Sequence, residues 1–196
     1  LKLGNPELNV VVFSGDGDLI AIGGNHLIHA ARRNMDITVI CVNNFNYGMT
    51  GGQAGPTTPV DARSTTSPYG NFEEPFNIPH LVAASGATYV ARWTVLHPRQ
   101  LERSIAEAMS KPGFSLVEVI APCPALYGRM NKEAQGLDTL HSYQSRCVVR
   151  NGADTKDLGI SFKGPIVVGK FVDIERPTFG DHYKQLIERI GNKEGR

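Results

Sequence analysis

The sequence lacks any long apolar run, and its charges are balanced. No stretch approaches the roughly 18 consecutive apolar residues that a membrane-spanning helix needs, and residues 1–9 lack the order of a signal peptide. Lysine and arginine total 20 while aspartate and glutamate total 19, which indicates neither a nucleic-acid-binding nor a strongly acidic protein. We therefore expect a soluble, cytoplasmic protein with no nucleic-acid partner and no membrane partner.

Cysteine is also scarce. The three cysteines, Cys41, Cys123 and Cys147, are an odd number with no close spacing. This pattern argues against a secreted disulfide framework and a self-contained zinc site, and it fits a reducing compartment. Residues 1–6 read like the end of a helix and the turn before a strand, so we expect that an N-terminal segment is missing.

The first part of the chain has the pattern of a parallel sheet. A short apolar run at 9–13 predicts a buried strand, 18–33 predicts a helix, and 36–42 predicts a second buried strand. A strand, a helix and a strand in this order form the right-handed crossover unit of a parallel sheet. The segment from 43 to 76 is rich in Gly, Pro, Thr and Ser, and a loop of that length is usually functional or packed against a ligand.

Regular elements resume after this loop. We expect a helix at 78–85, a strand at 88–93, a helix at 98–110 that faces Met109 inward, and a strand at 114–120. Beyond residue 121 the pattern is irregular, apart from a strand near 165–168 and a helix near 182–190. The predicted class is α/β, a parallel sheet with helices on both faces and an irregular C-terminal extension.

The most informative motif stands at the ends of the first two strands. Gly15-Asp16-Gly17-Asp18 follows the first strand, and Asn44 stands 28 positions after Asp16, at the end of the second. Parallel strands place ligands at their carboxyl ends, and turn glycines let backbone amides approach a diphosphate. Because Asp16 and Asn44 supply oxygen ligands of the kind that Mg²⁺ prefers, the motif predicts a diphosphate–metal site.

Other interpretations of these residues are weaker. An EF-hand calcium loop needs further oxygen ligands, which 19–22 does not supply. A dinucleotide site needs a third glycine where Ile20 stands. An ordinary turn with a helix cap stays open. His26 and His29 are three positions apart on the predicted helix, but no carboxylate or cysteine completes a metal site around them.

The spacing from Asp16 to the asparagine pair resembles the thiamine diphosphate signature. The stretch 43–53, Asn-Asn-Phe-Asn-Tyr-Gly-Met-Thr-Gly-Gly-Gln, together with Pro-Thr-Thr-Pro at 56–59, resembles the β subunits of 2-oxoacid:ferredoxin oxidoreductases. The resemblance extends over about 3–130, and 126–131 is most similar to the 2-oxoglutarate type.

The resemblance implies a pyrophosphate-type thiamine diphosphate-binding domain at 1–120 and an extension at 121–196 that packs on the domain, the cluster or a partner subunit. It implies Mg²⁺ ligation by Asp16, Asn44 and the backbone carbonyl of Asn46. Cys123 would be one ligand of a [4Fe–4S] cluster whose other cysteine ligands are absent from this sequence. The residues implied to line the cofactor are Gly15, Asp16, Gly17, Asp18, Asn44, Tyr47, Gly48, Met49 and Thr50.

The activity implied is thiamine diphosphate- and coenzyme A-dependent oxidative decarboxylation of 2-oxoglutarate to succinyl-CoA, or the reverse carboxylation, with ferredoxin as electron partner. No catalytic residue is assigned, because the resemblance places the activating glutamate on a companion α subunit. Arg129 is either a ligand of the substrate's distal carboxylate or a surface residue. Pyruvate or another 2-oxoacid, a non-oxidative thiamine diphosphate-dependent decarboxylase and a non-catalytic binding subunit remain alternatives.

Overall fold

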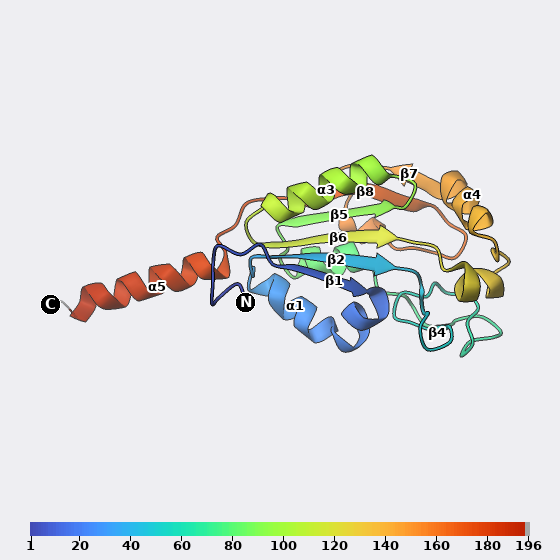
Figure 1. The fold of residues 1–196 in the computed structure, drawn as a ribbon, viewed down its shortest axis with the longest axis horizontal. Coiled ribbons are helices and arrows are strands. Elements are labelled where there is room, and N and C mark those ends of the chain that lie inside the picture. Colours follow the sequence, from blue (N-terminus) through green and yellow to red (C-terminus); the bar gives the residue numbers. More distant parts are fainter. Residues whose placement is uncertain (195–196) are drawn as a thin grey trace.

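A computed structural model describes residues 1–194 and shows a six-stranded sheet between helices (Figure 1). The strand order is β1-β2-β6-β5-β8-β7. The first four strands in this order are parallel, β8 runs antiparallel to β5, and β7 is parallel to β8. This arrangement confirms the predicted α/β class. The strands are β1 (Val11–Gly15), β2 (Ile37–Asn43), β5 (Tyr89–Thr94), β6 (Phe114–Ile120), β7 (Cys147–Val149) and β8 (Ile166–Asp173).

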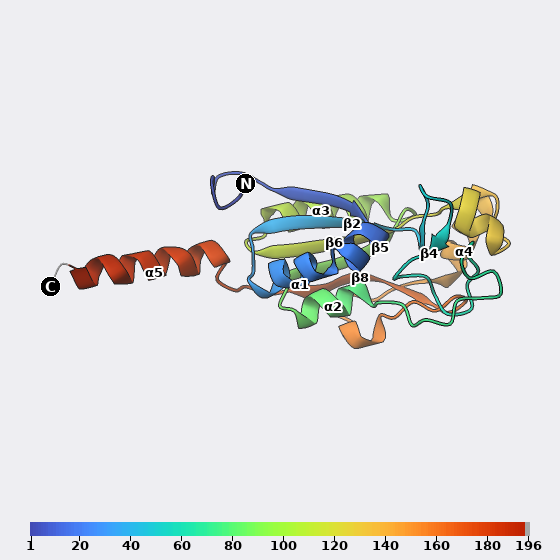
Figure 2. The ribbon, with the colours of Figure 1, turned by 90° about the horizontal axis from the view of Figure 1, so that it is seen from below.

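Helices cover both faces of this sheet, as expected. Helices α1 (Gly24–Arg32) and α2 (Ile78–Ala84) lie on one face, and α3 (Pro98–Ser110) lies on the other (Figures 1 and 2). Successive strand residues point to opposite faces. Accordingly, Leu116 of β6 packs with α1 and α2, whereas Val117 packs with α3. Apolar side chains therefore pack on both faces of the sheet, and they hold the carboxyl ends of the parallel strands next to one another.

The prediction of one continuous helix over 18–33 is wrong. The chain forms a short π-helix, η1 (Gly17–Ile22), and then α1, with a break at Gly23. A Cβ atom at Gly23 would lie 2.4 Å from the carbonyl oxygen of Asp18, so this sharp join needs glycine. In α3, Met109 is 39% exposed, which corrects its expected inward position.

The C-terminal part is more regular than its sequence pattern indicates. It contains η2 (Pro124–Gly128), α4 (Gly136–Arg146), η3 (Thr155–Asp157) and α5 (Phe179–Glu194), and β7 and β8 extend the central sheet. The division of the chain at residue 120 stays a prediction, and the sheet takes strands from both sides of it. Helix α5 projects away from the sheet (Figures 1 and 2). Among residues 1–194, no helix is both long and apolar enough to cross a membrane.

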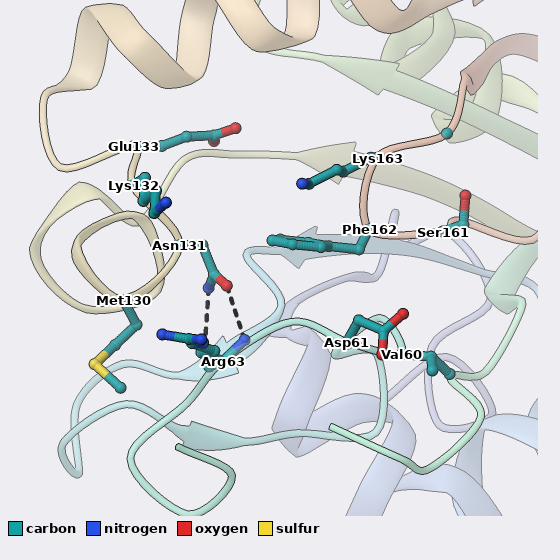
Figure 3. Close-up of a pocket in the computed structure, with 11 residues that line it drawn as sticks. Val60, Asp61, Arg63, Met130, Asn131, Lys132, Glu133, Ser161, Phe162 and Lys163 are labelled. Atoms are coloured by element: carbon teal, nitrogen blue, oxygen red, sulfur yellow. Dashed lines mark hydrogen bonds between the residues drawn. The ribbon is translucent and has the colours of Figure 1, made fainter. Parts of the chain in front are cut away.

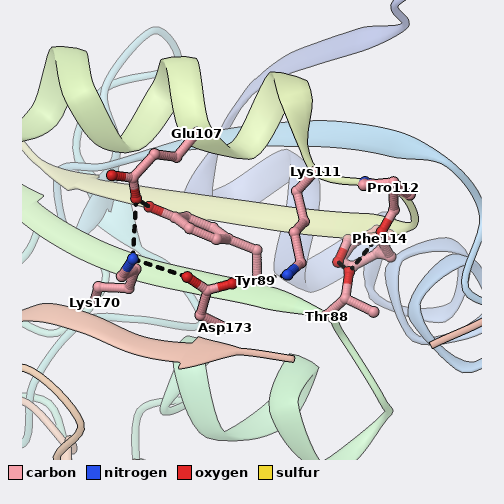
Figure 4. Close-up of polar contacts among 8 residues, drawn as sticks. All are labelled: Thr88, Tyr89, Glu107, Lys111, Pro112, Phe114, Lys170 and Asp173. Carbon is pink, nitrogen blue, oxygen red and sulfur yellow. Dashed lines mark hydrogen bonds and ion pairs between the residues drawn. The ribbon is translucent and has the colours of Figure 1, made fainter. Parts of the chain in front are cut away.

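A polar cluster fastens β8 to its neighbours (Figure 4). Lys170 of β8 contacts Glu107 of α3 at 3.2 Å and Asp173 at 2.8 Å, and Asp173 also contacts Lys111 at 2.8 Å. The two lysines hold the pKa of the Asp173 carboxyl below its usual value. The Tyr89 hydroxyl of β5 donates to Glu107 at 2.9 Å. The antiparallel strand is therefore tied by side chains to both α3 and β5.

Candidate functional site

The first side chain of the site is Asp16, which follows β1 and precedes η1. Its side chain is 2% exposed. The Thr57 hydroxyl donates to its carboxylate, and so do the backbone amides of Asn44, Asp16 and Gly17. Burial raises the pKa of Asp16, and these hydrogen bonds act in the opposite direction. The carboxylate is held by neutral donors, and no ion pair compensates its charge within residues 1–194.

A tight turn after β2 brings the second group of residues to Asp16. Phe45 has a φ of 65°, in the left-handed region that non-glycine residues rarely adopt. Two contacts hold it there: the Phe45 amide donates to Asn43 Oδ1 at 3.1 Å, and the Thr58 hydroxyl donates to the Phe45 carbonyl at 2.6 Å. The turn leads into β3 (Asn46–Tyr47), which pairs with β4 (Gln53–Ala54). Asn44 and Asn46 thus stay at the sheet edge beside Asp16.

Three side chains converge at Gly48. A Cβ atom placed there would lie 3.7 Å from Asn46 Oδ1, 3.9 Å from Cys123 Sγ and 4.0 Å from Asn44 Nδ2. The Asn46 amide group also donates to Cys123 Sγ at 3.6 Å. Asn46 Oδ1 is buried and accepts no hydrogen bond from residues 1–194. A buried oxygen without a donor is costly unless something binds it.

The oxygen atoms of these side chains are suitable ligands for a magnesium ion. The site offers one carboxylate, from Asp16, and side-chain amides from Asn44 and Asn46, one of which has an unsatisfied buried oxygen. Mg²⁺ is commonly bound through one or two carboxylates while phosphate and water complete its coordination. The unsatisfied oxygen belongs to the Asn46 side chain, whereas the sequence resemblance points to the Asn46 backbone carbonyl. Metal ligation by the Asn46 backbone carbonyl stays a prediction.

Gly17 and Tyr47 are in contact where the turn from β1 into η1 meets the turn after β2. A Cβ atom at Gly17 would lie 2.3 Å from the Tyr47 ring, so only glycine leaves room for this ring. Burial, followed by the charges of Asp16 and Asp18, raises the pKa of the Tyr47 hydroxyl. The Gly-Asp-Gly turn is therefore packed against an aromatic ring at Gly17, whereas Gly15 is partly exposed and a Cβ atom there would meet nothing within 4 Å.

Several of the predicted site residues lie on the surface or contact other side chains. Asp18 is exposed, Met49 is fully exposed, and the Thr50 hydroxyl contacts Gln53 Oε1 at 2.7 Å. Arg129 is exposed as well. The binding roles of these residues stay predictions.

The remaining histidines and cysteines form no further metal site. His26 and His29 are exposed on α1, and Cys41 is buried within β2. Across residues 1–194 there is no group of three His, Cys, Asp or Glu side chains placed to hold a metal ion. The described residues therefore supply one candidate thiolate for a [4Fe–4S] cluster, Cys123, and do not by themselves fit a complete cluster.

Sequence reasoning missed a buried charge pair behind the site. Arg92 Nε lies 2.6 Å from Glu118 Oε2, and both side chains are almost fully buried. The other Glu118 oxygen accepts from Asn43 Nδ2 at 2.8 Å. The pair therefore fixes the asparagine that holds the Phe45 turn. One signal was available: two neighbouring apolar strands each carry a single charge, of opposite sign.

The fold and the site together define a thiamine diphosphate-binding domain, and residues 1–119 match the family "Thiamine pyrophosphate enzyme, C-terminal TPP binding domain". The chain is 49% identical to 2-oxoglutarate synthase subunit KorB of Methanocaldococcus jannaschii, over 97% of this chain and 70% of that protein. It is 39% identical to a 2-oxoacid:ferredoxin oxidoreductase subunit beta of a Sulfolobus species, over 97% of this chain and 70% of that protein.

Among solved structures, a 2-oxoglutarate:ferredoxin oxidoreductase from Magnetococcus marinus is similar, with a TM-score of 0.83 and 30% identity. That enzyme was solved with 2-oxoglutarate, coenzyme A and succinyl-CoA bound. The match covers 97% of this chain and 65% of that one, so this chain spans about two thirds of such relatives. The chain belongs to the family of 2-oxoacid:ferredoxin oxidoreductase β subunits that includes 2-oxoglutarate synthase subunit KorB.

Proposed function

We propose that the chain is the thiamine diphosphate-binding part of the β subunit of a cytoplasmic 2-oxoglutarate:ferredoxin oxidoreductase. In the net reaction, 2-oxoglutarate and coenzyme A yield succinyl-CoA and CO₂. Two electrons reduce two ferredoxins, and the thiol releases one proton. The observation that carries this proposal is the meeting of Asp16, Asn44 and Asn46 at the sheet edge, in a chain 49% identical to a KorB subunit.

The residues of this chain would bind and orient the cofactor. Asp16, Asn44 and Asn46 would hold Mg²⁺. Gly15, Gly17 and Asp18 would line the diphosphate, while the Asp16 and Gly17 amides hydrogen-bond the Asp16 carboxylate. Thiamine diphosphate, when bound, supplies the electron sink that permits decarboxylation of a 2-oxoacid. Thr57 and the turn amides keep the Asp16 carboxylate in place, because they hydrogen-bond it in its charged form.

Other chains would complete the enzyme. We propose a companion α subunit that contributes the activating glutamate, and a ferredoxin that accepts the electrons. The exposure of β1 supports such an assembly, because this edge strand leaves Phe13 74% exposed and Val11 40% exposed. Large apolar side chains gathered on one surface commonly mark an interface.

Cys123 would donate one thiolate to a [4Fe–4S] cluster in the full-length complex. The other three ligands would come from outside residues 1–194. In the Cys123→Ser variant of that complex, we expect the iron content and the EPR signal of one cluster to fall while the fold is retained. Unchanged iron and an unchanged spectrum would show that Cys123 is structural only.

The metal site is tested by replacing the Asp16 charge. Asp16→Asn retains the shape of the side chain but removes the anion that would bind Mg²⁺, so we expect Mg²⁺-dependent thiamine diphosphate binding to weaken by at least about a hundredfold. Calorimetric titration of the full-length complex measures this affinity. The matched control is Asp61→Asn, which removes another loop carboxylate outside the metal site. Equal affinity in Asp16→Asn and the wild type would refute the site.

A further inference from the structure

The loop at 55–71, between β4 and α2, is a compact unit held by its own hydrogen bonds. The Asp61 amide donates to the Asn71 carbonyl, and the Asn71 amide donates to the Ala62 carbonyl, both at 2.8 Å. The Asn71 side chain also donates to the Thr58 carbonyl at 2.8 Å. Thr58, Ala62 and Asn71 are all buried. Because a compact loop packed by its own side chains keeps its internal shape, a displacement at one of its positions would reach the others.

Two hydroxyl groups of this loop hold residues of the candidate metal site. The Thr57 hydroxyl donates to the Asp16 carboxylate, and the Thr58 hydroxyl donates to the Phe45 carbonyl at 2.6 Å. Thr57 is 2% exposed and Thr58 is fully buried. Asp16 is the carboxylate of the site, and Phe45 lies between the two asparagines Asn44 and Asn46. The orientation of the loop therefore affects where the metal ligands lie.

The side chain of Asn131 clasps another part of the same loop (Figure 3). Asn131 Oδ1 accepts from the Arg63 amide at 2.8 Å, and Nδ2 donates to the Arg63 carbonyl at 2.9 Å. Nδ2 also donates to the Tyr127 carbonyl at 2.9 Å. The Asn131 backbone amide donates to the carbonyls of Tyr127 and Gly128 at 3.1 Å, so the residue is fixed at the end of η2. One side chain thus binds both backbone groups of Arg63, at a position 68 residues away.

The segment that ends at Asn131 also contacts the turn after β2. Cys123 accepts from the Asn46 side chain at 3.6 Å, and a Cβ atom at Gly52 would lie 3.1 Å from Leu126 Cβ. The segment 123–131 is therefore anchored beside the metal site before it reaches the loop. A unit attached at one point can pivot about that point, whereas attachment at two points fixes its orientation.

The backbone is strained on both sides of the clasp. Asp61, two residues before Arg63, has a φ of 69°, and Lys132, directly after Asn131, has a φ of 66°. Non-glycine residues rarely adopt this left-handed conformation, and it persists only where the surroundings impose it. The contacts around the clasp therefore hold both segments in one defined geometry.

We infer that Asn131 is a positioning residue of the candidate metal site. By clasping Arg63 it sets the orientation of the 55–71 loop, and the loop in turn keeps Thr57 against Asp16. Asn131 acts through Thr57 and not by contact with the cofactor. This inference rests on the proposed function for the nature of the site.

The test measures the Mg²⁺-dependent affinity for thiamine diphosphate by calorimetry on full-length complexes. Asn131→Ala removes the clasp, so we expect the affinity to fall about tenfold, because the loop must then be ordered when the cofactor binds. The matched control is Asn151→Ala, which removes a side-chain bond to the Lys170 amide at 3.0 Å, in β8. This control should retain the wild-type affinity.

A double-mutant cycle shows whether Asn131 acts through Thr57. Thr57→Val removes the hydroxyl that holds Asp16 and retains the shape of the side chain, so it should itself weaken binding. In that background Asn131→Ala should lower the affinity by at most about a further threefold, because the contact that it supports is already lost. A role in general stability would give the full tenfold loss in both backgrounds, and that result would overturn the inference.

Equal affinity in Asn131→Ala and the wild type would overturn the inference and leave the proposed function in place. A wild-type complex that binds no thiamine diphosphate in the presence of Mg²⁺ would overturn both. If Asn131→Ala does not assemble, the same comparisons are made with Asn131→Asp, which retains the acceptor for the Arg63 amide and loses the two donor bonds. We expect the affinity of Asn131→Asp to fall as well, and an unchanged value would again overturn the inference.

Discussion

Two buried carboxylates, those of Asp16 and Glu118, lie near the carboxyl edge of the sheet, and their hydrogen-bond and ion-pair partners differ. Glu118 faces the guanidinium of Arg92, so its charge is compensated inside the protein. Asp16 is held only by a hydroxyl and by backbone amides. A buried charge without a counter-ion is expensive unless a ligand supplies one. This contrast assigns Glu118 to support of the fold and leaves Asp16 available to a cation.

The role of Glu118 can be measured through stability. Glu118→Gln would leave the Arg92 charge buried without its partner, so we expect the free energy of unfolding to fall by about 3–5 kcal/mol. Urea unfolding of the full-length chain measures this change. The double variant Arg92→Met/Glu118→Gln removes both charges and should recover part of the loss. If the single variant is as stable as the wild type, the Arg92–Glu118 pair does not stabilise the fold.

For individual residues, the sequence predicted which side chains would lie together at the sheet edge. It did not predict the hydrogen bonds that keep those side chains in place. Asp16 and Asn44 could be placed together because parallel strands end at a common edge. The contacts of Thr57 with Asp16 and of Asn46 with Cys123 join positions 41 and 77 residues apart. No local pattern encodes such pairs, since they depend on how the 43–76 loop folds back.

Among the elements, the turn from β1 into η1 is the most constrained by packing. Gly17 contacts the Tyr47 ring so closely that a methyl group would overlap it, whereas a Cβ atom at Gly15 would meet nothing within 4 Å. The two glycines of one motif therefore have different roles. Gly17 allows two turns to approach each other, and Gly15 leaves open space at the end of β1.

The difference between the two glycines predicts different effects of alanine. Gly17→Ala should lower the free energy of unfolding by about 1–3 kcal/mol, because the added methyl group forces the ring or the turn to move. Gly15→Ala should change it by less than about 1 kcal/mol, since it only restricts the backbone. Thermal unfolding of the two variants and the wild type, without cofactor, measures these changes in stability. Equal stability of the two variants would contradict the close packing against Tyr47.

The elements themselves were predicted best where they are long and buried. β2, β5, β6 and α3 agree with the sequence pattern, because a continuous apolar run suits a buried strand and a 3.6-residue apolar period suits a helix. The break between η1 and α1 was missed because the apolar residues on both sides keep a helical spacing. β7 has three residues, too few to show any period, and its place in the sheet comes from pairing with β8.

At the scale of the whole molecule, the structure combines a candidate cofactor site with surfaces that suit binding to other chains. One candidate cluster thiolate, an exposed edge strand and a projecting C-terminal helix are all consistent with a chain that functions within a larger assembly. The matched region covers 70% of the length of the Methanocaldococcus jannaschii relative. The proposed activity therefore belongs to the complex.

The most direct test of that activity is coenzyme A-dependent reduction of ferredoxin, or of a viologen dye, by the full-length chain together with its partner subunit. We predict rapid reduction with 2-oxoglutarate and much slower reduction with pyruvate. A preference for pyruvate would retain the family and overturn the choice of substrate. Release of CO₂ from 2-oxoglutarate without reduction of ferredoxin or dye would contradict the central claim, because it would show a non-oxidative decarboxylase.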